Sequence, residues 1–351
     1  MKTILVTGGT GFIGNCFCKL LLEERPEYKV INVDVCTYAA NPSTIEEELK
    51  NPNYKFYKTD IRDREAIEKI FEEEKPDIVI SFCNKANFRA SLSMVGINIP
   101  LLVSVRNDPK MDYAPYALMT SIMSKRANGC VFQTNTAKAW FSGKLQGKSK
   151  IIINPIDDRY INVEYAGRDD VDRIATVGRI SKQKNQLLIL QAMDSLREKY
   201  PKLVLEIYGS DFGDGTKEIL DRYIVEHNLT ERVKFMGVCD NLETRLQGAI
   251  FVLSSDYEGM PNALMEAMAI GMPVVATDCP CGGPRDLIRD GNNGFLFDVG
   301  DARELAGSLN ILLSDKDKRL SLGMAAMKIR KQADSKTIYS QWKEYITEII
   351  R

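Results

Sequence analysis

Histidine is nearly absent from this chain of 351 residues, which contains only His227. A single histidine argues against Ser-His-Asp catalysis and against zinc sites built from several imidazoles. The eight cysteines form no Cys-x-x-Cys pair, and Cys16/Cys18 and Cys279/Cys281 have no histidine nearby, so we interpret them as small apolar core residues. No metal site is expected. Any chemistry must come from carboxylates, Arg, Lys, backbone N–H groups or a cofactor.

Long apolar runs and a strong net charge are also missing. No run reaches the length of about 18 residues that a membrane-spanning helix needs. The short apolar run near the start breaks into glycines, which is typical of a buried strand and not of a signal peptide. The net charge of -1 gives no overall field for nucleic acid. We therefore expect a cytoplasmic protein with reduced cysteines and no nucleic-acid partner.

Strand and helix patterns alternate along the whole chain, which predicts parallel α/β layering. The length suits two domains. We predict two Rossmann-like α/β/α domains facing a central cleft, with residues 1–155 and 156–333 as the domains. Residues 334–351 are expected to form a helix that packs back toward the first domain. The strands are predicted at residues 3–7, 29–34, 55–59, 77–82, 101–105, 129–133 and 151–154, and then at 173–177, 204–208, 233–235, 250–253, 273–276 and 294–297.

A first candidate site follows the strand predicted at residues 173–177. Gly178 and Arg179 form a turn, and Lys184 precedes a helix that begins near Asn185. Two cations beside a helix N-terminus suit a diphosphate, which needs positive charge and directed N–H donors. The alternative is that both side chains are simply solvated.

A second candidate segment runs from Glu258 through Gly259 and Met260 to Glu266. Pro261 is expected near the first turn of a helix, where its missing N–H has no cost. The N–H groups of Asn262 and Ala263 would then point out of the helix and hold a phosphate, while Glu266 reaches ribose hydroxyls. An ordinary amphipathic helix is the alternative, which the upstream cations make less attractive.

These two segments together resemble the family 4 glycosyltransferases of the GT-B fold, from about Asp77 to the C-terminus. The resemblance implies a retaining transfer of a hexose from a nucleotide diphosphate sugar, with a UDP-sugar favoured. Arg179 and Lys184 would stabilise the leaving diphosphate, Glu258 would contact the hexose and Glu266 the ribose. No bound cofactor is required for such transfer. The donor-binding residues implied are Arg179, Lys184, Glu258, Gly259, Met260, Asn262, Ala263 and Glu266, with Glu258, Arg179 and Lys184 catalytic.

Residues 1–76 show a different signature, a strand followed by a glycine-rich turn, a helix and an acid about 20 residues later. This stretch resembles the N-terminus of dTDP-glucose 4,6-dehydratases, which use NAD, and the likeness includes residues 37–39. NAD is therefore an expected ligand, or else the turn supplies backbone donors to the sugar-donor diphosphate. The residues concerned are Gly8, Gly9, Thr10, Gly11, Gly14, Asp34 and Asp60.

Dehydratase activity itself is not expected. The dehydratase family moves protons and hydride with a Tyr-x-x-x-Lys pair, and Tyr113, Tyr116 and Tyr160 each lack the lysine. The substrate domain of that family is missing as well. We interpret the chain as a composite, with residues 1–76 dehydratase-like and residues 77–155 belonging to a glycosyltransferase acceptor half. A non-catalytic, NAD-binding or chimeric protein is the alternative function.

The acceptor side carries fewer signals. Many family members have a histidine in the loop after the fifth strand, whereas this chain has Arg106, Asn107 and Asp108 there. These three residues are our candidates for acceptor-side contacts, and the acceptor class implied is a glycan or a lipid-linked molecule. A basic stretch with two aromatic residues suggests peripheral contact with the inner face of a membrane, although a solvated helix face is the favoured interpretation. It comprises Lys125, Arg126, Lys138, Trp140, Phe141, Lys144, Lys148 and Lys150.

Overall fold

The computed structural model describes residues 2–36, 42–165 and 172–351. The chain divides into two compact units. The first comprises Met1–Asn154 together with Lys336–Arg351, and the second comprises Pro155–Ser335. Residues 37–39, part of the dehydratase-like signature, lie outside the described residues.

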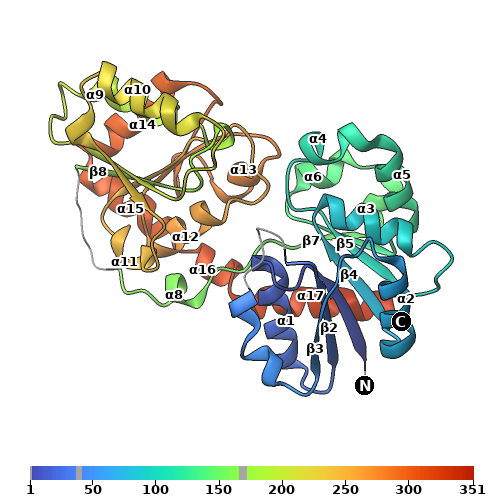
Figure 1. The fold of residues 1–351 in the computed structure, drawn as a ribbon. Coiled ribbons are helices and arrows are strands. Elements are labelled where there is room, and N and C mark those ends of the chain that lie inside the picture. The colour runs from blue at the N-terminus through green and yellow to red at the C-terminus, as the bar shows by residue number, and fades with distance from the viewer. Residues whose placement is uncertain (1, 37–41, 166–171) are drawn as a thin grey trace. The chain divides into compact units, whose positions relative to one another are not determined.

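The first unit is built on a seven-stranded parallel sheet in the order β3-β2-β1-β4-β5-β6-β7 (Figure 1). Strands β4, β5 and β6 are buried along their whole length, as expected for a parallel sheet covered on both faces. The order reverses between β1 and β4, which places a ligand crevice at their carboxyl ends. The strands are β1 (Thr3–Thr7), β2 (Lys29–Asp34), β3 (Tyr54–Lys58), β4 (Ile78–Phe82), β5 (Leu101–Ser104), β6 (Gly129–Phe132) and β7 (Ser149–Ile151).

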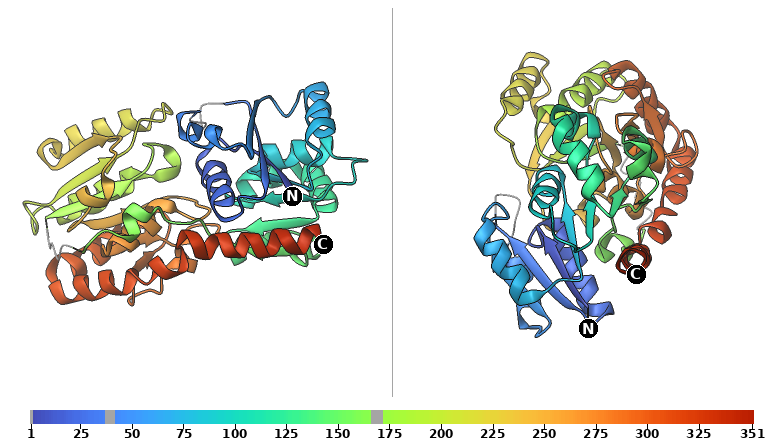
Figure 2. Two further views of the ribbon diagram at one scale, coloured as in Figure 1. Left: turned by 90° about the horizontal axis from the view of Figure 1, so that it is seen from below. Right: turned by 90° about the vertical axis from the view of Figure 1, so that its right-hand side faces the viewer.

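The last helix of the chain belongs to this first unit. Helix α17 (Ser335–Ile350) lies along the sheet (Figures 1 and 2) and buries Trp342, Tyr345 and Ile346 against it. The Tyr345 hydroxyl accepts a hydrogen bond from the Cys130 amide in β6 and donates one to the carbonyl of Lys148, the residue before β7. The other helices are α1 (Phe12–Glu24), α2 (Arg64–Glu74), α3 (Asn84–Ser93), α4 (Pro109–Asp112), α5 (Ala117–Arg126), α6 (Asn135–Trp140) and α7 (Gly143–Gln146), with short 3-10 turns η1 (Pro42–Ile45), η2 (Glu48–Lys50) and η3 (Ala114–Tyr116).

The second unit has a six-stranded parallel sheet in the order β10-β9-β8-β11-β12-β13. Its order reverses between β8 and β11, so its ligand crevice is expected at their carboxyl ends. The strands are β8 (Arg173–Val177), β9 (Val204–Tyr208), β10 (Val233–Gly237), β11 (Ile250–Leu253), β12 (Val274–Thr277) and β13 (Phe295–Phe297). The helices are α8 (Asp158–Ile161), α9 (Gln186–Leu196), α10 (Thr216–Glu226), α11 (Leu242–Arg245), α12 (Asn262–Ile270), α13 (Gly283–Leu287), α14 (Ala302–Ser314), α15 (Lys316–Ala326) and α16 (Ile329–Gln332), with η4 (Lys182–Lys184) and η5 (Thr230–Arg232).

Candidate active site

Three loops meet at the carboxyl edge of the second sheet, because β8, β11 and β12 are neighbours there. Hydrogen bonds join the loop after β8 to the loop after β11. The Asp256 amide donates to the Gln183 carbonyl (2.9 Å), and the Asn185 side chain donates to the Asp256 carboxylate (2.8 Å). The Ser254 hydroxyl donates to the Lys184 carbonyl (2.8 Å). The two sequence segments predicted to share a site are therefore brought together.

Glu258 is at the centre of this arrangement and is 7% exposed. Its carboxylate accepts hydrogen bonds from the Ser255 hydroxyl (2.7 Å) and from the Lys184 ammonium (2.5 Å). The Lys184 side chain is also mostly buried. Removal of either charge would leave the other one buried without a partner, which would destabilise the fold. A lysine has three donor hydrogens, so Lys184 keeps donors for a ligand.

Arg179 is exposed and makes a different contact. Its guanidinium stacks over the Phe212 ring, 4.6 Å from the ring centroid. Among the residues that the structure describes, no carboxylate forms an ion pair with it. Arg179 therefore offers a positive charge without an ion-pair partner among the described residues, in the same loop after β8 that carries Lys184.

Helix α12 begins at Asn262, with Pro261 as its N-cap in an extended conformation. The first helical hydrogen bond runs from the Met265 amide to the Pro261 carbonyl (3.2 Å). In the described part of the chain no side chain caps this helix. The amides of the first turn of α12, including that of Ala263, lie before the first helical hydrogen bond. Such amides can donate hydrogen bonds to a phosphate. Gly259 and Met260, just before the helix, are buried.

Glu266 lies one turn into α12 and faces the short helix α8. Burial raises the pKa of its carboxyl to about 7, while the nearby charge of Arg159 acts in the opposite direction. A hydroxyl that donates a hydrogen bond to a buried carboxylate stabilises its ionised form. This environment fits a residue that binds a diol.

The loop after β12 holds the Glu258 backbone, a feature that the sequence did not reveal. The Glu258 amide donates to the Pro280 carbonyl (2.6 Å), and the Cys281 amide donates to the Glu258 carbonyl (2.8 Å). Gly283, at the start of α13, packs directly on Gly259: a Cβ at position 283 would lie 1.9 Å from the Gly259 oxygen. The Gly-Gly-Pro sequence after a buried strand was the available signal for such a close approach.

The glycine turn of the first unit follows β1. Gly8 has a φ of +75°, which favours glycine, and a Cβ on Gly14 would lie 2.2 Å from the Gly8 oxygen. Gly9 packs against Asn32, because a Cβ there would lie 2.2 Å from its side-chain oxygen. Gly11 is the N-cap of α1, and no side chain caps that helix within residues 2–36, 42–165 and 172–351. The turn therefore has the geometry of a diphosphate loop.

The two predicted acids of this turn differ in availability. The Asp34 carboxylate is buried and accepts hydrogen bonds from the hydroxyl and amide of Thr10 and from the Cys36 amide. A ribose would have to share or replace the Thr10 contact. Asp60 pairs with Arg62 beside it (2.5 Å). The glycine turn thus fits the diphosphate of NAD. Asp34 can bind the adenosine ribose only if the Thr10 hydroxyl moves away from the Asp34 carboxylate.

Two other tyrosines do have a lysine four residues later, and the pairs are Tyr54–Lys58 and Tyr339–Lys343. In β3 the Tyr54 hydroxyl accepts a hydrogen bond from Asn32, and Lys58 is exposed. In α17 the buried Tyr339 has Arg25, just past the C-terminal end of α1, among its nearest charges, whereas the glycine turn is at the other end of that helix.

The acceptor-side candidates follow β5. Asp108 is buried and caps α4, accepting a hydrogen bond from the Lys110 amide (3.1 Å). The Asn107 side chain lies 3.4 Å from a carboxylate oxygen of Asp112. Arg106 packs over the Phe82 and Trp342 rings. Of the side-chain atoms of these three residues, Nε of Arg106 is buried without a hydrogen-bond partner in the described part of the chain.

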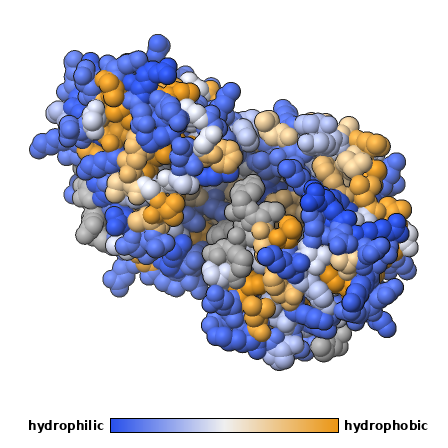
Figure 3. All heavy atoms as spheres, in the orientation of Figure 1, coloured by the Kyte–Doolittle hydropathy of each residue, from blue (hydrophilic) through white to orange (hydrophobic). Residues whose placement is uncertain are grey.

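The basic stretch does not form one continuous charged surface. Arg126 donates to three backbone carbonyls after α3, Lys148 donates to the Ala127 carbonyl, and Lys150 pairs with Glu348. Phe141 is buried. Apolar side chains are exposed nearby, in the region of α4 and α5 (Figure 3), and they are Met111, Tyr116 and Leu118.

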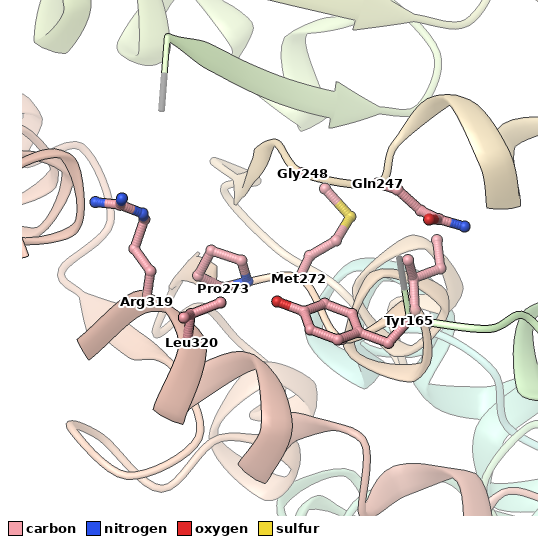
Figure 4. Close-up of a pocket in the computed structure, with 9 residues that line it drawn as sticks. Tyr165, Gln247, Gly248, Met272, Pro273, Arg319 and Leu320 are labelled. Atoms are coloured by element: carbon pink, nitrogen blue, oxygen red, sulfur yellow. The ribbon is translucent and has the colours of Figure 1, made fainter. Parts of the chain in front are cut away.

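A separate pocket lies at the amino ends of β11 and β12, the edge of the second sheet opposite Glu258 (Figure 4). Gly248 and Pro273 line it, next to Met272 and Tyr165. Arg319 at its rim is 6% exposed and donates to the Leu312 carbonyl. In the described residues no cluster of three or more His, Cys, Asp or Glu could hold a metal ion, and no helix is long and apolar enough to cross a membrane.

Comparison with known families assigns the two parts of the chain differently. Residues 161–329 match the family described as Glycosyl transferases group 1, and residues 4–101 match the NAD dependent epimerase/dehydratase family. The predicted composite of a dehydratase-like start and a remainder that resembles glycosyltransferases is confirmed. The dehydratase-like match continues to residue 101, past the boundary expected near residue 76.

Individual relatives support both parts. A glycosyltransferase of Methanocaldococcus jannaschii, MJ1059, is 29% identical over 273 residues, which cover 69% of this chain and 65% of that protein. This share exceeds what residues 161–351 can supply, so the likeness extends into the first unit. A dTDP-glucose 4,6-dehydratase of Haemophilus influenzae is 43% identical over 93 residues, or 26% of this chain and 27% of that enzyme. The chain thus matches less than two thirds of the length of either relative.

The fold itself is found in solved glycosyltransferases. The structure of Anabaena Alr3699/HepE in complex with UDP-glucose aligns with a TM-score of 0.83 at 20% identity, covering 99% of this chain and 100% of that one. The predicted fold class, two Rossmann-like α/β domains of the GT-B type, is confirmed.

Proposed function

We propose that the chain is a retaining hexosyltransferase that takes a hexose from a nucleotide diphosphate sugar, with a UDP-sugar as the favoured donor. The observation that carries the proposal is the Lys184–Glu258 pair, which lies at the β8/β11 edge directly before the N-terminus of α12. It lies within residues that match the group 1 glycosyl transferases. Charge, directed N–H donors and a held carboxylate are what an activated sugar needs.

Each residue has a proposed role in this site. The leaving diphosphate is stabilised by Arg179, by the remaining donors of Lys184 and by the first-turn amides of α12. Glu258 accepts hydrogen bonds from the hexose, and Glu266 from the ribose. Fixed cations and backbone donors supply the electrostatic stabilisation, so the transfer requires no cofactor. The acceptor is a glycan or a lipid-linked molecule.

A panel of UDP- and GDP-sugars tests this function directly. We expect one UDP-sugar to bind in calorimetry and to be turned over or slowly hydrolysed, and the product to keep the anomeric configuration of the donor in NMR spectra. Glu258→Gln should bind UDP but lose the added affinity of the sugar. Asp317→Asn, on the exposed side of α15, is the matched control. Failure of every sugar nucleotide to bind would refute the proposal.

NAD binding without turnover is the second candidate function. It is favoured by the glycine turn and by the match of residues 4–101 to NAD-dependent enzymes. Calorimetric titration with NAD tests it. Tight NAD binding combined with no binding of any sugar nucleotide would select this function over transfer.

A peripheral membrane contact would use the α4–α5 face, where Met111 and Leu118 are exposed beside Lys110. Sedimentation with phosphatidylglycerol vesicles tests this contact, and Leu118→Ser should weaken it. Equal sedimentation of both proteins would count against this face.

A further inference from the structure

Arg106 is a cation of the first unit for which the described residues supply no anionic partner. It follows β5 at the carboxyl edge of the first sheet and is partly buried. Within the described residues its guanidinium has no carboxylate at ion-pair distance, and its Nε is buried without a hydrogen-bond partner. Such a donor costs free energy as long as it stays unpaired.

Aromatic rings hold the guanidinium in place. Its Cζ lies 5.4 Å from the centre of the Phe82 ring and 5.5 Å from that of Trp342. Trp342 comes from α17 and also packs on Phe17, with ring centres 5.3 Å apart. The rings pre-orient the guanidinium through cation–π contacts, and they leave its polar edges to other partners.

Only one edge of the guanidinium is used. Its Nη1 donates to the Asn154 side-chain oxygen (3.0 Å). Nε is unpaired, and Nη2 makes no hydrogen bond in the described part of the chain. The Nε–Nη2 edge is one of those that hold a carboxylate or phosphate with two parallel hydrogen bonds.

The nearby acids do not occupy this edge. Asp108 caps α4, and Asp112 is in contact with Asn107. Burial lowers the pKa of Arg106 to about 10, so the side chain stays charged at neutral pH and still lacks a counter-ion. An arriving anion would satisfy both the charge and the unpaired donor.

We propose that the Nε–Nη2 edge of Arg106 binds an oxyanion, a phosphate or carboxylate carried by the acceptor. The assignment to an acceptor rests on the proposed function, whereas oxyanion binding at Arg106 stands independently of it. The acceptor is then an anionic molecule, such as a phosphoglycan or a phospholipid-linked sugar, and Arg106 selects it over neutral sugars.

The fluorescence of Trp342 reports on this site, since the chain has only two tryptophans. In a Trp140→Phe protein, Trp342 remains as the single fluorophore, in contact with Arg106. Titration of the full chain with glycerol 1-phosphate, and separately with glucuronate, should change its emission in a saturable way. The same titrations in saturating UDP separate an acceptor-type anion from occupation of the donor diphosphate site.

Arg106→Met should abolish the response, and Arg106→Lys should weaken the affinity roughly tenfold because it loses the fork of two donors. Arg64→Met, an exposed arginine on α2, is the matched control and should bind like the parent. No saturable change in the Trp140→Phe protein, the same affinity in a folded Arg106→Met protein, or complete competition by UDP would each overturn the proposal. These titrations need no turnover, so they can succeed where the proposed transfer fails.

Discussion

Replacing Gly283 by alanine tests whether the loop after β12 positions Glu258. The new Cβ would lie 1.9 Å from the Gly259 oxygen and 2.9 Å from the Pro261 ring. The first distance is more than 1 Å inside the 3.0 Å below which real Cβ contacts essentially never occur. Both neighbours are rigid, so the backbone at Gly259 must move. Overpacking of this kind costs about 1–3 kcal/mol of stability.

The displacement should affect binding more than folding. A shift of about 1 Å at a reacting group lowers turnover by about 100-fold. Because Glu258 is proposed to contact the hexose and not the nucleotide, Gly283→Ala should reduce the affinity for the UDP-sugar and leave that for UDP nearly unchanged. Calorimetry with both ligands measures this difference, and a thermal melt establishes that the protein is folded.

Gly307→Ala is the matched control. Gly307 lies in α14, and a Cβ there meets no atom within 4 Å. Alanine should raise helix stability there by up to about 1 kcal/mol without changing the binding of either ligand. If Gly283→Ala kept the parent affinity for the UDP-sugar and the parent turnover, the positioning role of this loop would be refuted.

Three further predictions concern charged groups. Lys184→Met leaves the Glu258 carboxylate buried without its cation. The free energy of unfolding, measured by urea titration, should therefore fall by roughly 3 kcal/mol. An unchanged urea midpoint would contradict the pairing. Burial alone would raise the pKa of Glu74, but hydrogen bonds from Lys29, Lys55 and Tyr57 lower it from 4.5 to about 2. The stabilisation is present above pH 4.5 and is lost as the pH falls toward 2, so Glu74→Gln should flatten this part of the acid-unfolding curve. Burial raises the pKa of Glu266 from 4.5 to about 7, so its ionisation destabilises the fold increasingly between these values, and Glu266→Gln should raise Tm more at pH 8 than at pH 4.5. Donor affinity should also rise as the pH passes 7, since ribose hydroxyls bind the ionised carboxylate best, and Glu266→Gln should remove this dependence.

The sequence was enough to predict both sheets, because apolar runs ending in Gly, Asp or Ser mark buried parallel strands. Predicted and observed strands differ by two residues or fewer at most ends, although the strand predicted at residues 151–154 is β7, Ser149–Ile151. Lys184 and Glu258 were predicted for one site because both follow strands at the same kind of edge, and the structure joins them.

The contacts that complete the sites could not be predicted, since they depend on packing between distant segments. Nothing in the local sequence says that Gly283 lies on Gly259, or that Asp34 is held by Thr10. The Arg106 surroundings come from β4, β5 and α17, which are separated by up to 260 residues in sequence. Only the fold brings them together.

The place of Trp342 has a consequence for how the chain folds during synthesis. Phe17 and Phe82 are translated before the second unit, Pro155–Ser335, whereas the Trp342 ring that packs on both of them is translated after it. The first sheet must therefore wait, with an open apolar groove, while the whole second unit is made and can fold. Nascent chains stalled before residue 335 should show a folded second unit beside a first unit that is still sensitive to protease.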